Sequence, residues 1–223
     1  MNASESRTLL KRDAFGLVCR VNDNGPGSVA IAVERDTGEA RWWLRPLARS
    51  LARREARALS TLKGIEGVPQ LLYWDGRRLR RSWIDGRPMH QARPEDPGYF
   101  REALRLLRRL HAAGVVHNDL AKEPNWLVTA NGRPALVDFQ LAARPRHRGR
   151  AFRALAYDDL RHLLKHKRSY CASCLSDRQR SILARRSVIA AAWARTGKPV
   201  YRVITRRLLG WSDREGAGDR GQR

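Results

Sequence analysis

Polar residues in the middle of the chain have the types and the spacing to hold a divalent metal ion and to accept a proton. His117 and Asp119 follow the short apolar pair Val115-Val116, and Asn125 comes six residues after Asp119. A second run, Asp138-Phe139-Gln140, ends the next short apolar segment. Asp138 and the amide oxygen of Asn125 are hard oxygen ligands of the kind that Mg²⁺ takes from proteins. Asp119 would then orient and deprotonate an attacking hydroxyl.

The elements expected before these residues are a small antiparallel sheet and one helix. Apolar, β-rich runs at 17–21 and 28–33 flank a turn, and a third strand is expected over 39–44. Within that third strand, one of Trp42 and Trp43 should be buried and the other exposed. A helix over 47–62 and a strand pair over 70–74 and 79–83 complete this part.

The rest of the chain is expected to be mostly helical. Asp96-Pro97 has the pattern of a helix start, and Gly114 has the pattern of a helix end. Short strands are expected over 126–128 and 135–137, on either side of the turn Asn131-Gly132. Further helices are expected over 157–167 and 177–196. A last helix would place four apolar residues on one face: Val200, Ile204, Leu208 and Trp211.

With this order of elements, His117-x-Asp119…Asn125 followed by Asp138-Phe139-Gln140 resembles the catalytic loop and metal-binding motif of the protein-kinase-like superfamily. The resemblance covers about residues 10–165 and is strongest to small bacterial members, the lipopolysaccharide core (Kdo/heptose) kinases and the RIO-type kinases. It implies an α+β, two-lobed fold. The implied divisions are a small antiparallel-sheet N-lobe (1–83), a hinge connector (84–88), a reduced, mostly helical C-lobe (89–211) and a flexible tail (212–223).

The resemblance also implies ATP and Mg²⁺ in the cleft between the lobes. Asp119 would be the catalytic base, with Lys122 beside it in the same loop and His117 organising that loop. Asn125 and Asp138 would be the metal ligands.

On the nucleotide side, the resemblance places Gly16 in the segment that covers the phosphates, although an ordinary turn glycine would fit equally well. Glu55 would be the helix carboxylate that pairs with a cation of the sheet, or else a solvated residue paired with neighbouring arginines. Ser82, Trp83 and Ile84 would form the hinge facing adenine.

Three departures from the superfamily pattern bear on activity. Asp119 and Asn125 are one residue further apart than usual, so the loop needs a local bulge. The expected third strand has no lysine, so Arg41 or Arg45 would have to replace it, or Lys11 would have to reach in. Gln140 replaces the glycine of D-F-G and no A-P-E segment follows, which favours a small-molecule or lipid acceptor over a docked peptide.

Composition adds a strong positive charge. Lys and Arg number 45 against 22 Asp and Glu, giving a net charge of +23, and most of the surplus falls between Arg144 and Gly210. This balance predicts an anionic partner, although an arginine-rich genome would also produce it. Three cysteines, Cys19, Cys171 and Cys174, indicate no disulfide framework and therefore a reducing cytoplasm. A zinc site formed by His162, His166, Cys171 and Cys174 is not favoured.

The leading functional hypothesis is an ATP-dependent phosphotransferase acting on a hydroxyl of a lipopolysaccharide-core sugar or another membrane-associated acceptor. The alternatives are a protein serine/threonine kinase and a pseudokinase that binds nucleic acid or anionic lipid. Specific nucleic-acid binding is not expected, because no RNA-reading aromatic motif is present. With no apolar leader and no apolar run long enough to span a bilayer, the protein is expected in the cytoplasm, with peripheral membrane contact left open through its basic C-terminal helices.

Overall fold

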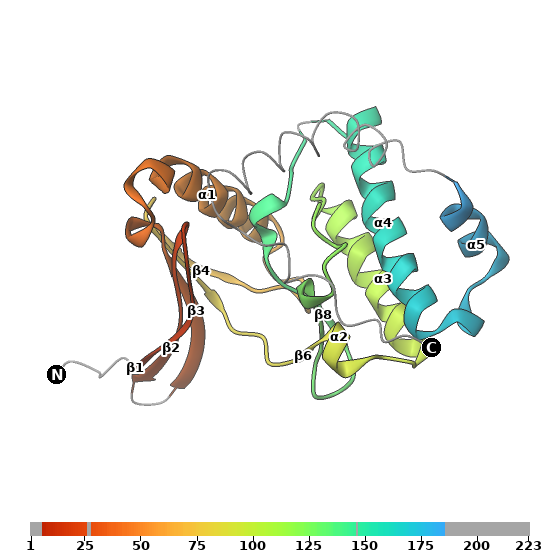
Figure 1. Cartoon of the computed structure of the whole chain (residues 1–223), viewed down its shortest axis with the longest axis horizontal. Coiled ribbons are helices and arrows are strands. Elements are labelled where there is room, and N and C mark those ends of the chain that lie inside the picture. The colour runs from red at the N-terminus through yellow and green to blue at the C-terminus, as the bar shows by residue number, and fades with distance from the viewer. Residues whose placement is uncertain (1–5, 26–27, 146, 186–223) are drawn as a thin grey trace.

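The computed structural model describes residues 6–25, 28–145 and 147–185. The last helix expected from the sequence, the face formed by Val200, Ile204, Leu208 and Trp211, and the tail lie outside these residues. In Figure 1 the chain forms two parts, with a sheet and the helix α1 in the first and the helices α3 and α4 side by side in the second.

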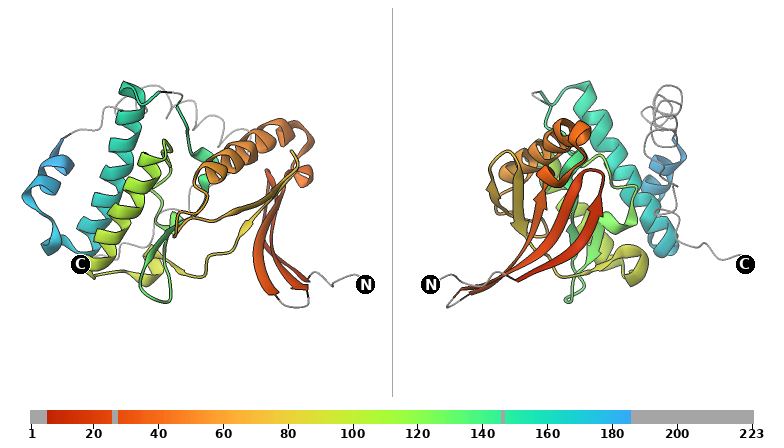
Figure 2. Two further views of the ribbon diagram at one scale, coloured as in Figure 1. Left: turned by 180° about the vertical axis from the view of Figure 1, so that it is seen from behind. Right: turned by 60° about the vertical axis from the view of Figure 1, so that its left-hand side comes forward.

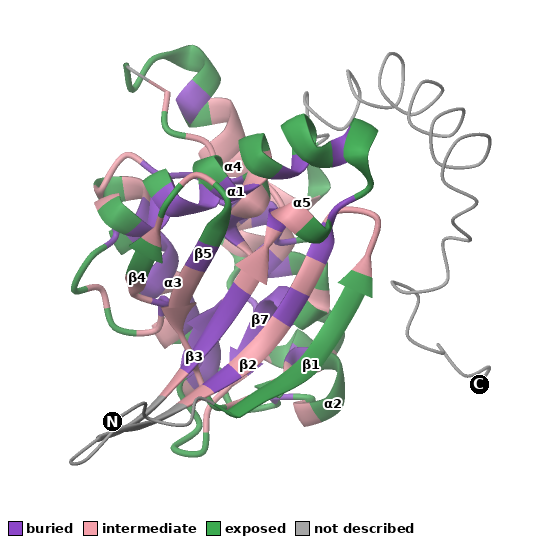
Figure 3. Cartoon of the chain, turned by 90° about the vertical axis from the view of Figure 1, so that its left-hand side faces the viewer, coloured by how far each residue is buried: buried purple, intermediate pink, exposed green. Residues whose placement is uncertain are grey.

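The first part is a five-stranded antiparallel sheet with strand order β1-β2-β3-β5-β4. Its strands are β1 (Ser6–Asp13), β2 (Gly16–Gly25), β3 (Ser28–Asp36), β4 (Leu71–Trp74) and β5 (Arg78–Ser82). The helix α1 (Arg45–Thr61) connects β3 to β4. Figure 3 shows β1 exposed along its length, whereas buried residues recur along β2 and β3. The second hairpin expected from the sequence is confirmed, with β4 antiparallel to β5.

The strand expected over 39–44 does not form. Two 3₁₀ turns occupy this region, η1 (Thr37–Glu39) and η2 (Trp42–Leu44). The Asp36 carboxylate caps the first turn by accepting a 2.7 Å hydrogen bond from the Gly38 N–H, so the chain leaves the sheet there. Trp42 and Trp43 are 78% and 43% exposed, so the expectation that one would be buried is also wrong. The third strand of the sheet, β3, ends earlier, at Asp36.

The second part combines helices with a small sheet. The sheet has the order β6-β7-β8, with β6 (Arg87–Pro88), β7 (Trp126–Val128) and β8 (Pro134–Leu136). The helices are α2 (Met89–Ala92), α3 (Pro97–Ala112), α4 (Arg150–Tyr170) and α5 (Asp177–Ala184). Three further 3₁₀ turns are η3 (Glu123–Asn125), η4 (Phe139–Leu141) and η5 (Ala172–Cys174).

The helix α3 follows its sequence signals closely. The Asp96 side chain accepts hydrogen bonds from the backbone N–H groups of Gly98 and Tyr99, which cap the helix start. Gly114 has a φ of +79° and ends the segment in the left-handed conformation that glycine adopts at no steric cost. The apolar face of α3 joins a single core that also includes Leu59, Leu62, Trp126, Leu136 and Phe139. Figure 2 shows α3 and α4 running alongside each other from the back as well.

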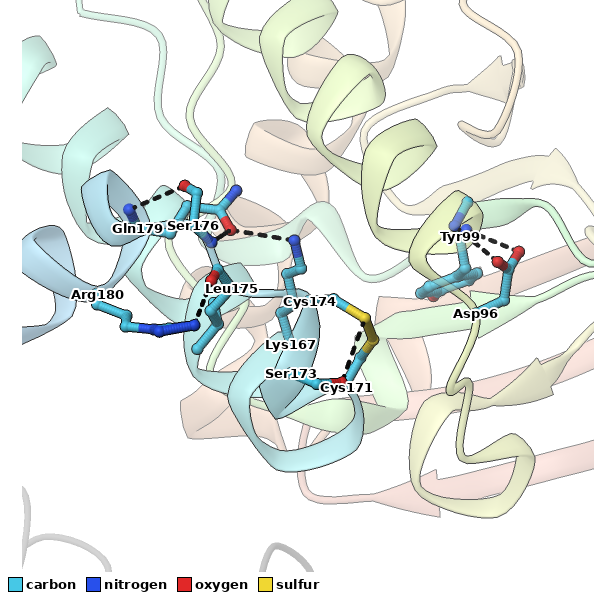
Figure 4. Close-up of a disulfide and its surroundings, with 11 residues drawn as sticks. Asp96, Tyr99, Lys167, Cys171, Ser173, Cys174, Leu175, Ser176, Gln179 and Arg180 are labelled. Atoms are coloured by element: carbon cyan, nitrogen blue, oxygen red, sulfur yellow. Dashed lines mark hydrogen bonds between the residues drawn. A yellow bond between two sulfur atoms is a disulfide. The ribbon is translucent and has the colours of Figure 1, made fainter.

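A disulfide joins Cys171, at the C-terminal end of α4, to Cys174 (Figure 4), so two of the three cysteines that were expected to form no disulfide framework are bridged. The sulfur atoms of Cys171 and Cys174, two of the four residues considered for a zinc site, are bonded to each other in this structure. Among the described residues, no group of three or more potential metal-binding side chains comes together. The following helix, α5, starts with a capping box in which Ser176 and Gln179 bond each other's backbone.

Candidate active site

The loop from His117 to Asn125 is fixed in place by a buried carboxylate on α4. Asp159 accepts hydrogen bonds from the backbone N–H groups of His117 (2.8 Å) and Asn118 (3.0 Å). Its Oδ2 also lies 3.2 Å from Nε2 of His111 on α3. Asn118 has a φ of +64°, a conformation that asparagine tolerates better than most residues. Asp159 therefore holds the sharp bend that aims the next residue, Asp119, out of the core.

His117 links the loop to the metal motif. Its Nε2 donates a 3.0 Å hydrogen bond to the carbonyl of Val137, the residue before Asp138. Its ring lies 4.6 Å, centroid to centroid, from the ring of Phe139, and both side chains are fully buried. This geometry fits the organising role that the superfamily resemblance implies for His117.

Asp119, Lys122 and Asn125 are brought together at the end of the loop. Nζ of Lys122 lies 2.8 Å from Oδ2 of Asp119. Nδ2 of Asn125 donates to the backbone carbonyl of Asp119 at 2.9 Å and to Oδ2 of the same residue at 3.0 Å. The carboxylate of Asp119 is thus oriented from two sides, as a group that accepts a proton from a substrate must be.

The extra residue in the loop is absorbed by a turn. Glu123–Asn125 forms η3, with Pro124 inside it, and this is the local bulge that the spacing requires. Two residues near the end of α4 hold the turn: the Tyr170 hydroxyl donates to Oε2 of Glu123 at 2.5 Å, and Nε2 of His166 donates to the Leu120 carbonyl at 2.8 Å. Burial lowers the pKa of His166, which favours the neutral ring in the folded protein.

Asn125 and Asp138 lie at neighbouring strand ends. The Val137 N–H donates to the Asn125 carbonyl at 3.0 Å, which fixes the backbone before Asp138 against the backbone of Asn125. Because the amide nitrogen of Asn125 is bonded to Asp119, its Oδ1 is the atom left for a cation. Oδ1 of Asp138 accepts a 2.8 Å hydrogen bond from Nε2 of Gln140, the residue that replaces the usual glycine. A carboxylate and an amide oxygen form a donor set suited to Mg²⁺.

The sheet cation that pairs with Glu55 comes from a strand that the sequence did not suggest. Nε of Arg81, on β5, lies 3.0 Å from Oε1 of Glu55, whose side chain is only 1% exposed. Of the expected substitutes, Arg41 directly precedes η2 and Arg45 begins α1, where its side chain donates to the Ala40 carbonyl. Lys11, on β1, lies 3.4 Å from Asp13.

Gly16 begins β2 at the turn that joins it to β1, and its φ is +127°. A Cβ atom at this position would lie 2.2 Å from the carbonyl oxygen of Asp36. Close packing of the turn against the end of β3 therefore accounts for the glycine.

Of the three expected hinge residues, two lie at the sheet and the third lines a cavity. The Ser82 hydroxyl accepts from the Gln70 N–H, and the Trp83 N–H donates to the Ile31 carbonyl, so both extend the sheet. Ile84 lines a cavity of about 330 Å³ beside α3. Neither Asp119 nor Asp138 lines that cavity.

Two residues important for this arrangement, Asp159 and Arg81, were not singled out from the sequence. The sequence did offer a signal for Asp159. It is one of few acidic residues in a helix of mostly apolar and basic residues, and a carboxylate that is buried in such a helix needs a partner. Arg81 had none, because its proximity to Glu55 depends on how β5 is placed in the sheet.

The sheet with its Glu55–Arg81 ion pair, the catalytic loop and the metal motif together define a protein-kinase-like phosphotransferase fold of two lobes. A family model of the RIO domain matches residues 32–174, well over half of the chain. The chain therefore belongs to the RIO domain family. The α+β, kinase-like architecture expected from the sequence is confirmed by this match.

Proposed function

We propose that the protein transfers the γ-phosphate of ATP to a hydroxyl group. The observation that supports this best is the convergence of Asp119, Lys122 and Asn125, with contacts of 2.8 to 3.0 Å, at the loop fixed by Asp159. A carboxylate so oriented next to a cation has no evident role in packing, because Lys122 is 57% exposed.

In this proposal each residue has one task. Asp119 accepts the proton of the acceptor hydroxyl as its oxygen forms a bond to the γ-phosphorus, and the bond from that phosphorus to the β–γ bridging oxygen breaks to release ADP. Lys122 provides positive charge beside Asp119. Asn125 and Asp138 would hold Mg²⁺, which supplies charge neutralisation on the phosphates.

Two acceptors are open to experiment. The RIO domain match favours a serine or threonine hydroxyl of a protein. A lipopolysaccharide-core sugar or another membrane-associated hydroxyl is the second candidate, supported by the net charge of +23 and the short segment between η4 and α4. No helix in the described part of the chain is long and apolar enough to cross a membrane. We propose that the protein acts in the cytoplasm, where ATP is supplied, with any membrane contact peripheral.

The experiment is transfer of radiolabelled phosphate from [γ-³²P]ATP in the presence of Mg²⁺, with separate cytosolic and membrane fractions as acceptors. Wild-type protein should label a band or a lipid in one fraction, and Asp119→Asn should abolish that label. Asp75→Asn, in the β4–β5 turn, is the matched control and should leave labelling intact. A protein band indicates the first acceptor class and a labelled lipid the second.

A pseudokinase would give a different pattern. It would label nothing in either fraction, and Asp119→Asn would behave as wild type. In direct titration the wild-type protein would not bind ATP. It would bind an oligonucleotide, with an affinity that falls steeply as salt increases, and the proposed function would then be replaced by that of a polyanion-binding module.

A further inference from the structure

The third strand of the sheet, β3, contains no lysine that could bind the nucleotide phosphates. Val33 of β3 lies directly between two arginines, with Arg20 opposite it on β2 and Arg81 opposite it on β5. Residues directly opposite one another in neighbouring strands project from the same face of a sheet. We propose that Arg81, with Arg20 beside it, provides the fixed positive charge that binds the nucleotide phosphates. This inference rests on the proposed ATP-dependent function.

Arg81 is held in place by a buried partner. Its Nε lies 3.0 Å from Oε1 of Glu55, and the two side chains are 14% and 1% exposed. Neither carboxylate oxygen of Glu55 has a hydrogen-bonded partner among the described residues, so the contact with Arg81 is an ion pair and not a hydrogen bond. Glu55 thus fixes the position of Arg81 by charge and leaves the N–H groups of Arg81 available for an anion.

Arg20 has unused hydrogen-bonding capacity on the same face. Its guanidinium lies over the ring of Trp83, at 5.2 Å from the ring centroid, where the hinge begins. Its Nε is buried and has no hydrogen-bond partner among the described residues. A buried donor without a partner is costly, and a phosphate oxygen would satisfy it.

The helix α1 connects this pair of arginines to the metal motif. Arg54, next to Glu55 on α1, donates hydrogen bonds to the carbonyls of Leu141 (3.2 Å) and Ala142 (3.4 Å). These two residues directly follow Asp138-Phe139-Gln140. The sheet arginines and Asp138 are therefore positioned by one rigid helix, as expected if both act on one chain of phosphates.

The alternative is that Glu55–Arg81 is only a structural ion pair. Arg45 provides the control. It was also expected to bind the phosphates, but the structure places it at the start of α1. If the phosphates are bound by Arg81, substitutions at Arg81 and Arg45 will have unequal effects on ATP and equal, small effects on adenosine.

The test is a calorimetric titration of the protein with ATP and, separately, with adenosine, each in the presence of Mg²⁺. Arg81→Met should weaken ATP binding by tenfold or more and change adenosine binding less than twofold. Arg45→Met should change neither by more than twofold. The double variant Val33→Lys, Arg81→Met, which places a cation on β3 directly opposite position 81, should recover most of the lost ATP affinity.

Several outcomes would overturn the inference. If wild type binds ATP and Arg81→Met binds it equally well, the arginine has no part in phosphate binding and the proposed function stands. If wild type binds no ATP, the proposed function fails and this inference fails with it. Should Arg81→Met not fold, Arg20→Met decides: we expect a threefold to tenfold loss for ATP alone, and an unchanged affinity would exclude the two-arginine arrangement.

Discussion

The Asp159 carboxylate accepts a 2.8 Å hydrogen bond from the backbone N–H of His117, across 42 residues of sequence. We expect Asp159→Asn to lower the free energy of unfolding by about 2–3 kcal/mol, because buried N–H groups would then face an amide in place of a charged acceptor. The check is urea denaturation followed by circular dichroism. Asp158→Asn is the matched control, since Asp158 is the residue directly before Asp159, is partly exposed and contacts His162. Equal losses in the two variants would contradict a special role for Asp159.

A substitution at Lys122 should change catalysis without changing stability. We expect Lys122→Met to lower kcat about 10- to 100-fold, because the variant removes the cation 2.8 Å from the Asp119 carboxylate. The unfolding midpoint should stay within experimental error, because the Lys122 side chain is mostly exposed. Steady-state labelling assays give kcat, and Lys63→Met, an exposed substitution after α1, should leave kcat unchanged. A loss of stability without a loss of kcat would remove Lys122 from the site.

Alanine substitutions at Gly16 and Gly76 distinguish the stability cost of a steric clash from the cost of backbone strain alone. Both have positive φ, but a Cβ at Gly16 would clash with the Asp36 carbonyl, whereas nothing lies within 4 Å of a Cβ at Gly76. Gly76→Ala should lower the free energy of unfolding by about 1 kcal/mol, from backbone strain alone. Gly16→Ala should cost at least about 2 kcal/mol, because the clash adds to the strain. Thermal denaturation of both variants gives the comparison, and equal costs would show that the turn can move away from β3.

The burial of His166 predicts that the free energy of unfolding falls in mild acid. Burial lowers its pKa in the folded protein below the ordinary value of 6.5, although the Leu120 carbonyl and nearby Glu123 oppose this. Below pH 6.5 the unfolded chain therefore binds more protons at this site than the folded chain does, and stability falls as pH falls. His166→Gln can keep a donor for Leu120 and cannot titrate.

The measurement for His166 is the unfolding midpoint in urea between pH 8 and pH 5. The difference between wild type and His166→Gln should shift in favour of the variant as pH falls through about 6.5, the ordinary histidine value. His162, on the same helix, also has its pKa lowered by burial, so some pH dependence will remain in the variant. Parallel curves for the two proteins would show that His166 keeps the same charge in the folded and unfolded states.

Local signals predicted the helices and hairpins well, and distant contacts were where prediction failed. Asp96 with Pro97, and Gly114, bound α3 correctly because capping acts within a few residues. The strand expected over 39–44 rested on the β propensity of Trp42 and Trp43, and the Asp36 cap with the helix that follows overrides it. The strand β1 was missed because almost all of its residues are exposed, so it lacks the apolar alternation that marks a half-buried strand.

In the candidate site, sequence patterns identified the residues proposed to act on the substrate and missed the residues that hold them in place. Asp119, Asn125 and Asp138 were found because their spacing is short and resembles a known motif. The partner of Glu55 was not found, since the lysine was sought on the third strand, whereas Arg81 reaches Glu55 from β5. No pattern within one segment encodes which strand lies next to another.

The buried contact between His117 and Phe139 has a consequence for the energetics of nucleotide binding. That contact, the Asp159 bonds to the loop and the Glu55–Arg81 ion pair all join protein groups to one another, so they are made as the chain folds. The conformational entropy lost in ordering these side chains is then charged to folding rather than to ATP binding. The residues around the proposed nucleotide site would therefore be ordered before ATP binds, and ATP binding would carry little further entropy loss from ordering them.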